Sequence, residues 1–289
     1  MRKYRIIIAV FITRQRGPKM LVNSHVQIPK SVLKQFAYSN GQVNYLDLNN
    51  CRIRSCSPKT LGTEFGYYSE AMEQWLSSEI EGPFSELSAQ INHFAADGSH
   101  DLVLPVSVEE TCKKYVTASM ARSEVALKAF YDKSVTAAFA DDQENHDLLV
   151  YYSTVNKKGI SPLIGDHQML TLVNHTNRQF VVPRNCFYDI NHKGYSCIIV
   201  PISPYCALEL VPHDYSANNV NGTTVRLGIV DKPEIVEAMN IRALQVEYTY
   251  NKSFVASANR EELDQLRLYI EDNKNMLESC RNELLTDHN

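Results

Sequence analysis

The chain of 289 residues lacks the short motifs that identify several common classes of enzyme. It contains no Gly-x-x-x-x-Gly-Lys-Ser/Thr, no Gly-x-Gly-x-x-Gly, no Gly-x-Ser-x-Gly and no His-Glu-x-x-His. These patterns build a phosphate-binding loop, a dinucleotide site, a nucleophile elbow and a zinc-binding helix, respectively. Their absence removes support for these enzyme classes and favours a protein that is not an enzyme.

An excess of positive charge and closely spaced cysteine pairs are also missing. The 29 basic and 33 acidic residues give a formal net charge of -4, which offers no general attraction to nucleic acid or to an anionic membrane. The seven cysteines are scattered, and no Cys-x-x-Cys pair begins a zinc or redox site. Scattered thiols are typical of a reducing compartment, so the sequence predicts a cytoplasmic protein with no cofactor and no metal.

The first segment, residues 1–19, has two interpretations. Three basic residues precede an apolar run from Ile6 to Ile12, which is followed by polar residues rather than by a small-residue cleavage site. This run is too short to cross a bilayer. Either it forms a β-strand, or translation begins at Met20 and residues 1–19 are a misannotated leader.

Residues 20–139 are predicted to begin with a β-hairpin. After an Asn40-Gly41 turn, strand-like segments at 42–48 and 51–56 flank Asn49-Asn50. Because an asparagine pair tolerates the positive φ of a tight turn, we expect the two strands to be antiparallel and the turn to lie on that pair.

Helices are expected to follow the hairpin. Apolar residues at helical spacing predict a helix from about Glu70 that is broken at Gly82-Pro83, where Pro83 opens a second helix. Ser107-Val-Glu-Glu110 is a capping box with Ser107 at the N-cap, and it predicts a helix that ends near residue 139.

Residues 148–257 are predicted to be rich in strands, because the polar stretch 140–147 ends the helical periodicity. Segments 169–174 and 179–183 flank four polar residues, which suits a second hairpin. The further elements expected here are strands at 197–202 and 207–211 and a helix at 232–247. We expect residues 20–257 to form one compact domain.

The last helix, predicted within residues 258–289, repeats apolar residues every seven positions. Such a seam packs either against the body of the same chain or against a second copy in a homodimer, in which Asn273 would fix the register. The first row of the seam consists of Leu263, Ile270, Leu277 and Leu284.

Together these elements predict an α+β fold. Antiparallel β-hairpins and a small mixed sheet pack with several long helices, and the chain ends in a long C-terminal helix.

Few polar residues stand out as candidates for chemistry. Arg122 lies in a run of small residues on an otherwise apolar helix, where a buried guanidinium would need a carboxylate or phosphate partner. Glu73 and Glu81 are eight residues apart, so their two carboxylates could share one helix face.

A histidine-based metal site has weak support. Its ligands would have to converge from separate strands, and histidines of this kind are more often ordinary surface or core residues. The residues concerned are Asp166, His167, His175 and His192.

The order of several motifs resembles a known family. The chain reads His25-x-x-x-Pro29-x-x-x-Leu33-x-x-Phe36, then the hairpin, Ser57-Pro58, Tyr68, and Glu73-x-x-Leu76-x-x-x-x-Glu81. Later landmarks are Arg122, Phe180 to Asn185, Pro201 to Pro204, and Asn240 in a helix leading to Phe254-Val255. Over residues 23–257 this order resembles the bacterial family catalogued as domain of unknown function 4238. The resemblance implies a fold and an intracellular bacterial setting, and it implies no activity.

Two positions depart from the family pattern. The family's opening histidine precedes its proline by three residues, where this chain has Val26. His25 occupies the preceding position, so in an extended segment its side chain points to the opposite face. Where the family resembles Phe-x-Thr-Ser-Asp-Asn-Pro, this chain reads Phe180-Val-Val-Pro-Arg184-Asn185-Cys186. If the family's aspartate binds a metal or acts as a base, this chain has lost that function.

Three hypotheses for the function follow. The first is a non-catalytic binding or regulatory protein of a bacterial defence or toxin-associated locus, which holds a small anionic ligand through Arg122 and Arg184. The second is a structural protein that dimerises through the C-terminal seam. The third is a hydrolase of phosphodiesters, which requires convergence of His25, Glu73, Glu81 and Asn185.

Overall fold

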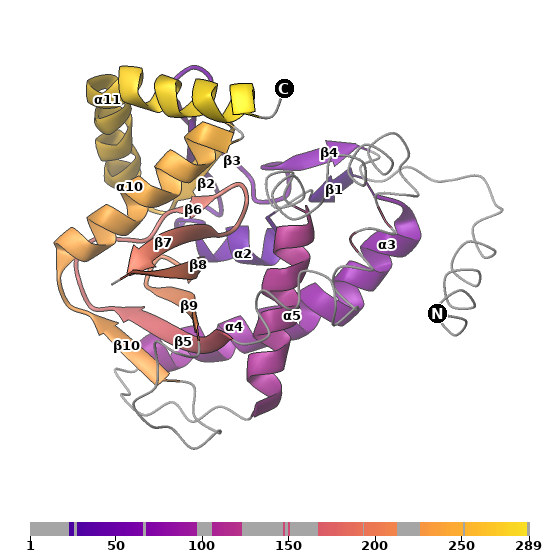
Figure 1. Cartoon of the computed structure of the whole chain (residues 1–289). Coiled ribbons are helices and arrows are strands. Elements are labelled where there is room, and N and C mark those ends of the chain that lie inside the picture. The colour runs from indigo at the N-terminus through magenta and orange to yellow at the C-terminus, as the bar shows by residue number, and fades with distance from the viewer. Residues whose placement is uncertain are drawn as a thin grey trace.

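The computed structural model has an α+β architecture, as the sequence predicts, and the chain ends in a long helix (Figure 1). It describes residues 23–25, 28–65, 68–96, 106–122, 147, 150, 167–192, 194–212, 226–250 and 252–287. The predictions for residues 1–19 and for Met20 as the start lie outside these ranges. None of the helices in the described ranges combines the length and the apolar character that a membrane crossing requires.

A four-stranded sheet joins the predicted hairpin to strands from the second half of the chain. Its order is β3-β2-β11-β6, with β2 at Val43–Asp47, β3 at Arg52–Cys56, β11 at Phe254–Ser257 and β6 at Val182–Pro183. The antiparallel pairing of β2 with β3 confirms the hairpin.

The turn of this hairpin differs from the prediction in one respect. Its positive φ falls on Cys51 (54°) and not on Asn49-Asn50. The Asp47 carboxylate accepts hydrogen bonds from the Asn49 backbone N–H (3.0 Å) and the Asn50 side chain (2.7 Å). These two bonds hold the asparagines to the end of β2, so the chain reverses one residue later.

A five-stranded mixed sheet forms the centre of the molecule, in the order β10-β5-β9-β8-β7 (Figure 1). The β8–β9 pair confirms the two strands predicted at 197–202 and 207–211. The strands are β5 at His167–Asn174, β7 at Tyr188–His192, β8 at Tyr195–Ser203, β9 at Cys206–Pro212 and β10 at Arg226–Val230.

The predicted second hairpin is wrong, because β5 and β6 belong to different sheets. β5 pairs with β9 and, in parallel, with β10. Two hydrogen bonds hold the segment after β5 at a distance from that strand. The Phe180 N–H donates to the Pro204 carbonyl (2.9 Å), and the Val181 N–H donates to Asn240 Oδ1 (3.0 Å). Tertiary partners therefore override a sequence pattern that is locally suited to a hairpin.

The helix predicted from Glu70 is confirmed, but the break predicted at Gly82-Pro83 is wrong. Helix α3 (Glu70–Trp75) continues through a π-helical segment η1 (Leu76–Glu81) into α4 (Gly82–Ala96). The Gly82 N–H donates to the Ser77 carbonyl, five residues earlier. In a regular α-helix, the ring of Pro83 would clash with the carbonyl four residues earlier. The wider π turn moves that carbonyl away, so Pro83 is accommodated without a break.

Helix α5 packs against α4 and η1, and three shorter elements complete the first part of the chain. Helix α5 begins at Val106, so Ser107 lies inside the helix and is not its N-cap as predicted. The described part of α5 ends at Arg122, and the predicted continuation to residue 139 lies outside the described ranges. The shorter elements are β1 at Asn23–His25, α2 at Lys30–Gln35 and β4 at Thr63–Phe65, with β1 antiparallel to β4.

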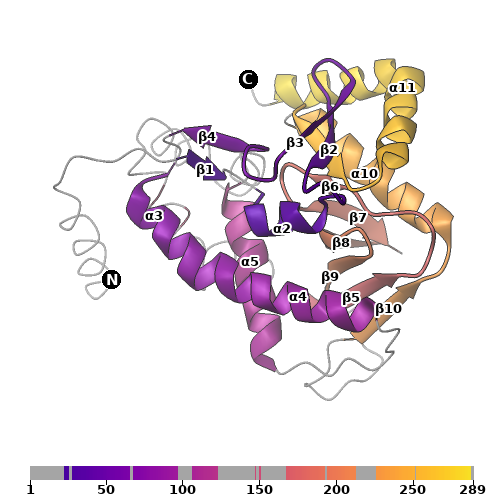
Figure 2. The same ribbon diagram turned by 180° about the vertical axis from the view of Figure 1, so that it is seen from behind.

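Helices α10 (Pro233–Tyr250) and α11 (Arg260–Asp287) confirm the two helices predicted near the C-terminus. Asn273 interrupts α11 with non-helical backbone angles (φ -116°, ψ 16°), and its side chain donates to the Tyr269 carbonyl (3.0 Å). The helix therefore bends sharply there (Figures 1 and 2). Asn273 shapes this bend within one chain.

The seam of α11 lies against the body of the same chain. Leu263, Ile270 and Leu277 are buried in a core that α11 shares with α10, while the side chain of Leu284 lies outside the described residues. This is the intramolecular alternative that the sequence left open. A homodimer that uses the same residues stays a prediction.

Two hydrophobic cores lie on opposite faces of the five-stranded sheet. The first contains α2, α3, η1, α4 and α5, and the second contains α10 and α11. Alternation along β9 shows the division, because Leu208 and Leu210 belong to the first core and Ala207 to the second. Figure 2 shows the helices of the first core from behind.

Candidate functional site

A buried ion pair joins helix α5 to the π-helical segment. Arg122 Nη1 donates to Glu81 Oε1 at 2.7 Å. The Arg122 side chain has 0 % exposure, whereas the Glu81 side chain is 24 % exposed. The carboxylate partner that the sequence required for a buried Arg122 is therefore Glu81.

The π-helical segment positions Glu81. Glu81 occupies the last position of η1, immediately before Gly82. A Cβ atom on Gly82 would lie 2.9 Å from the Ser77 carbonyl oxygen. Glycine is required here because the widened turn brings that carbonyl too close for any larger residue. Segments of π-helix are frequent at functional sites, where they redirect side chains.

A polar stripe runs along the buried face of α5. Tyr115, Ser119 and Arg122 are spaced i, i+4 and i+7, so they lie on one face of the helix. All three are fully buried. Tyr115 stacks on Phe84 of α4, with ring centroids 3.5 Å apart and planes 2° apart. The stacking holds the Tyr115 end of the stripe against α4.

A thiol completes the stripe. Tyr115 Oη and Cys186 Sγ are 2.8 Å apart and share a hydrogen bond. Burial raises the pKa of the Cys186 thiol to about 12 and raises the pKa of Tyr115 well above its usual value. Both groups therefore stay protonated at neutral pH, and Cys186 is not a nucleophile.

Arg122 itself stays charged. Burial alone would lower the pKa of its guanidinium, but the combined influence of Glu81, Tyr68 and Tyr115 raises that pKa above its usual value. The site therefore contains a permanent cation that is fully removed from water.

The guanidinium of Arg122 is incompletely paired. Within the described part of the chain, its buried Nε and Nη2 atoms have no hydrogen-bond partner, and neither does Ser119 Oγ. Nε and Nη2 form one edge of the guanidinium, the edge that binds a carboxylate with two parallel hydrogen bonds. Ser119 lies three residues before Arg122, so the two side chains share one face of α5.

Arg178 shows the same edge when it is filled. Its Nε donates to Glu262 Oε1 (2.9 Å), and its Nη2 donates to Glu262 Oε2 (2.8 Å). Glu262, at 2 % exposure, also accepts hydrogen bonds from the Gln179 backbone N–H and from Asn240. Among the described residues, the Nε/Nη2 edge is therefore filled by a carboxylate in Arg178 and vacant in Arg122.

Arg184, the second arginine of the predicted ligand site, has its own partners. Its Nη1 donates to Ser253 Oγ (3.2 Å), and its Nη2 donates to Glu64 Oε1. The side chain is 24 % exposed and connects the end of β6 to β4. Arg122 and Arg184 are thus paired with different carboxylates.

The predicted hydrolase residues are distributed over separate elements. Among the described residues, Glu81 alone of the four pairs with Arg122. Asn185 is 2 % exposed, its backbone N–H donates to Glu247 Oε2 (3.3 Å), and Glu73 belongs to α3. The side chain of His25 lies outside the described residues, so convergence of the four stays a prediction.

The histidines considered as metal ligands do not converge. His167 begins β5 and His175 follows its end, eight residues further along an extended strand, which corresponds to roughly 26 Å. Strand β7, which ends at His192, is not a neighbour of β5. In the described ranges, no three His, Cys, Asp or Glu side chains are grouped as metal ligands.

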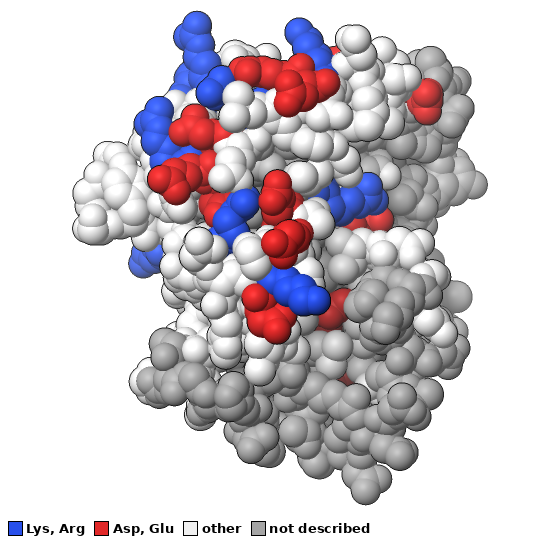
Figure 3. All heavy atoms as spheres, turned by 90° about the vertical axis from the view of Figure 1, so that its left-hand side faces the viewer, with Lys and Arg blue, Asp and Glu red and all other residues white. Residues whose placement is uncertain are grey.

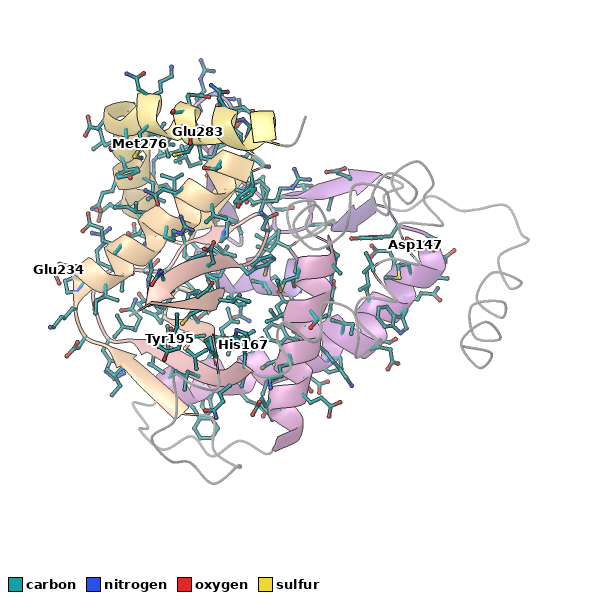
Figure 4. The ribbon with its side chains drawn as sticks, in the orientation of Figure 1. Asp147, His167, Tyr195, Glu234, Met276 and Glu283 are labelled. Atoms are coloured by element: carbon teal, nitrogen blue, oxygen red, sulfur yellow. The ribbon has the colours of Figure 1, made fainter. Side chains whose placement is uncertain are left out.

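Figure 4 shows two labelled acidic residues, Asp147 and Glu234, on opposite sides of the molecule. Asp147 lies beside α3, where its carboxylate accepts a hydrogen bond from the Ser69 backbone N–H (3.1 Å). Glu234 lies at the start of α10 on the opposite side. Arg122 lies on α5, in the core formed with α3, η1 and α4, whereas Glu234 lies in the first turn of α10.

The chain belongs to the family described as Protein of unknown function (DUF4238), whose model matches residues 25–270. No curated protein and no solved structure matches the chain. The family assignment confirms the resemblance of the motifs and supplies no activity.

Several landmarks of that resemblance meet in the structure. Asn240 on α10 accepts a hydrogen bond from the Val181 N–H (3.0 Å) and donates to the Gln179 carbonyl (2.8 Å). The Phe180 N–H donates to the Pro204 carbonyl. These landmarks fix the segment before β6 between the sheet and α10, which explains them as scaffold residues.

Sequence reasoning identified Arg122 and Glu81 separately but missed their pairing. It also missed the roles of Ser119 and Tyr115, although polar residues at i, i+4 and i+7 on an apolar helix were a usable signal. Glu209, a single acid within the apolar strand β9, was missed in the same way.

Proposed function

We propose that this protein is a non-catalytic binding or regulatory protein whose interior site at Arg122 holds the carboxylate group of a small ligand. The observation that carries the proposal is the vacant edge of a fully buried guanidinium. Its Nε and Nη2 have no acceptor among the described residues, although the matching edge of Arg178 is filled by Glu262. A buried donor without a partner costs roughly 1–3 kcal/mol, which a bound acceptor would recover.

Among anionic ligands, the charges favour a monoanion over a dianion. Because Arg122 and Glu81 already neutralise each other, a singly charged carboxylate brings the site to a net charge of −1. A dianionic phosphate would leave a larger uncompensated charge in a buried position. A carboxylate also reproduces the geometry that Glu262 adopts on Arg178.

Ser119 extends the site. Its buried hydroxyl donates to one of the two carboxylate oxygens, each of which has a further lone pair after it accepts from the guanidinium. The ligand reaches this position past Glu81, because Glu81 is the partly exposed member of the ion pair.

Formate is a suitable probe because it is the smallest carboxylate. We expect sodium formate to raise the unfolding temperature of the wild-type protein above that in sodium chloride of equal ionic strength. The Arg122→Gln variant should lose this increase, whereas Arg267→Gln, at a partly exposed position on α11, should retain it. Absence of the increase in the wild type, or an equal increase in both variants, would refute the proposal.

The Ser119→Ala variant separates binding from folding. We expect its stability to equal or exceed that of the wild type by up to about 1 kcal/mol, because an unpaired buried hydroxyl is removed. Its affinity for 13C-labelled formate, measured by NMR titration, should fall roughly fivefold.

Ser88→Ala is the matched control on the neighbouring helix. Ser88 Oγ donates to the Ser85 carbonyl (3.0 Å), so this variant should lose about 1 kcal/mol of stability while its formate affinity stays unchanged. If Ser119→Ala loses stability as Ser88→Ala does, and still binds formate as the wild type does, Ser119 has no place in the site.

A contribution of Arg184 to ligand binding stays a prediction. Its two terminal nitrogens already donate to Glu64 and Ser253. If Arg184 contributes, Arg184→Gln lowers the formate affinity; otherwise the variant behaves as Arg267→Gln does.

A further inference from the structure

The part of α11 after the bend at Asn273 forms an arm, which comprises residues 274–287 (Figures 1 and 2). Up to residue 283, the last whose side chain the structure describes, Leu277 is the one buried side chain of the arm. Met276, labelled in Figure 4, is 42 % exposed. The part of α11 before the bend is held more firmly, because it buries Glu262, Leu263, Leu266 and Ile270.

Two polar side chains of the arm, three residues apart and therefore on one face, contact the end of α10. Glu278 Oε1 accepts hydrogen bonds from Tyr248 Oη (2.6 Å) and from Lys252 Nζ (2.7 Å). Arg281 Nη1 donates to the carbonyls of Tyr248 (3.1 Å) and Thr249 (3.3 Å). These bonds attach the arm to one docking surface, which consists of Tyr248, Thr249 and Lys252.

Asn273 is the hinge between the two parts of α11. Its backbone angles are non-helical, and its side chain donates to the Tyr269 carbonyl (3.0 Å). This carbonyl belongs to the last turn before the bend, where a helix end leaves carbonyls without an intrahelical donor. The Asn273 side chain therefore caps that end. Asparagine is also a weaker helix former than alanine, so this position favours the bend over a continuous helix.

The sequence of α11 is nevertheless suited to a continuous helix. Leu263, Ile270 and Leu277 are seven residues apart on both sides of the hinge, with no residue inserted or deleted between them. This spacing is typical of an uninterrupted helix that packs along one seam. If Asn273 becomes helical, α11 straightens and the arm points away from the docking surface of its own chain.

We propose that the arm exchanges between two copies of this chain. In the exchanged homodimer α11 is straight, and the arm of each copy binds the docking surface of the other copy. The exchange reproduces the contacts of the arm with an identical surface, so the main opposing term is the association of two chains. Figure 3 shows acidic and basic side chains interspersed on the side that faces left in Figure 1, so no large area of one sign there repels a second copy.

Two charge-reversing variants test the exchange directly: Glu278→Lys on the arm and Lys252→Glu on the docking surface. Each variant alone places like charges where the wild type has an ion pair. In a mixture of the two, both ion pairs form only if each arm docks on the other variant. With one full-length variant labelled with 15N, native mass spectrometry at micromolar concentration should show the mixed dimer in roughly tenfold excess over both unmixed dimers, because like-charge contacts disfavour the latter.

The matched control is the pair Arg267→Glu and Glu271→Lys. This ion pair lies within the part of α11 before the bend, so exchange of the arm does not separate its members. Mixing these two variants should give no excess of mixed dimer. A mixture of the arm and docking-surface variants that stays monomeric, or that forms mixed and unmixed dimers in random proportion, would overturn the proposal.

Asn273→Ala covers the case in which the charge-reversed chains do not fold. Alanine favours the continuous helix in both copies, so sedimentation equilibrium should show a dimer association constant about tenfold above that of Asn275→Ala. Asn275 is exposed on the arm, and its replacement favours the bent and straight forms equally. Equal association constants would overturn the proposal. The outcome is independent of formate binding, because the arm contacts α10 whereas Arg122 lies on α5.

Discussion

Arg122 is fully buried and Arg178 is largely buried, but the hydrogen-bond partners of their guanidinium groups differ. The Nε and Nη2 edge of Arg178 is filled by Glu262, which also accepts from the backbone of Gln179 and from Asn240. Arg122 is more deeply buried, yet it has one carboxylate contact, at Nη1, in the described structure. The first arrangement satisfies its donors and connects α10, α11 and the segment before β6. The second leaves donors unused, which is expected at a binding site and unexpected in a scaffold.

The largest effect is expected where the filled fork is broken. Replacing Glu262 with alanine removes the acceptor of Arg178 Nε and Nη2 and one of the two acceptors of the Asn240 amide, and should reduce the free energy of unfolding by about 3–5 kcal/mol. Urea denaturation measures this loss. Glu271→Ala, which removes an exposed partner of Arg267, should cost no more than about 1 kcal/mol. Similar losses in the two variants would show that the filled fork is not a scaffold element.

Removing the Glu81 carboxylate from Arg122 should cost less, and a ligand should restore part of the loss. Glu81→Gln removes the carboxylate of the buried Arg122, and we expect a loss of about 2–3 kcal/mol, because water reaches the partly exposed position 81. Formate should restore part of this loss. In Glu271→Ala, which leaves no buried guanidinium edge vacant, formate should stabilise no more than it does in the wild type. Failure of formate to stabilise Glu81→Gln would contradict the vacancy at Arg122.

The π-helical segment provides a smaller test, because it positions Glu81 without touching the ligand. In Gly82→Ala the added Cβ meets the Ser77 carbonyl oxygen at 2.9 Å, so we expect a loss of about 1–3 kcal/mol and a weaker response to formate. Thermal and urea unfolding measure the loss of stability, and NMR titration measures the response to formate. Glu86→Ala, at an exposed position on α4, should change stability by less than about 0.5 kcal/mol. A neutral Gly82→Ala would mean that the π turn relaxes freely.

The smallest expected effect concerns pH. The pKa of Cys186 is about 12 in the folded protein against 9.0 for an ordinary thiol, so between these values the unfolded chain releases this proton more readily. The contribution of Cys186 to stability is therefore fully present below pH 9 and is lost as the pH rises towards 12.

Urea midpoints at pH 8 and pH 10 measure this effect. The decrease between them should be smaller in Cys186→Ser than in the wild type by about 1 kcal/mol, because one pKa unit corresponds to about 1.4 kcal/mol. Cys280→Ser, at an exposed position, should match the wild type. Equal decreases in all three proteins would show that Cys186 is not protected from ionisation.

Local patterns in the sequence predicted the elements of the fold well. The hairpin at β2 and β3, the start of the helix at Glu70, the β8–β9 pair and both C-terminal helices follow from periodicity and turn residues. These features depend on interactions between residues that are close in sequence.

The errors arose where distant partners decide the structure. The segment after β5 suits a hairpin, but Pro204 and Asn240 hold it elsewhere. Gly82-Pro83 suits a helix break, yet the π turn absorbs the proline. The site was partly predictable: the need of Arg122 for a carboxylate followed from its apolar surroundings, while the identity of that carboxylate depended on how α5 crosses η1.

The most direct test of the vacant edge is a high-resolution crystal structure of the wild-type protein soaked in formate. Our interpretation predicts a formate with its oxygens about 2.7–3.1 Å from Nε and Nη2 of Arg122 and one of them near Ser119 Oγ. A carbonyl or carboxylate of the protein itself on that edge of Arg122, with formate excluded, would contradict it.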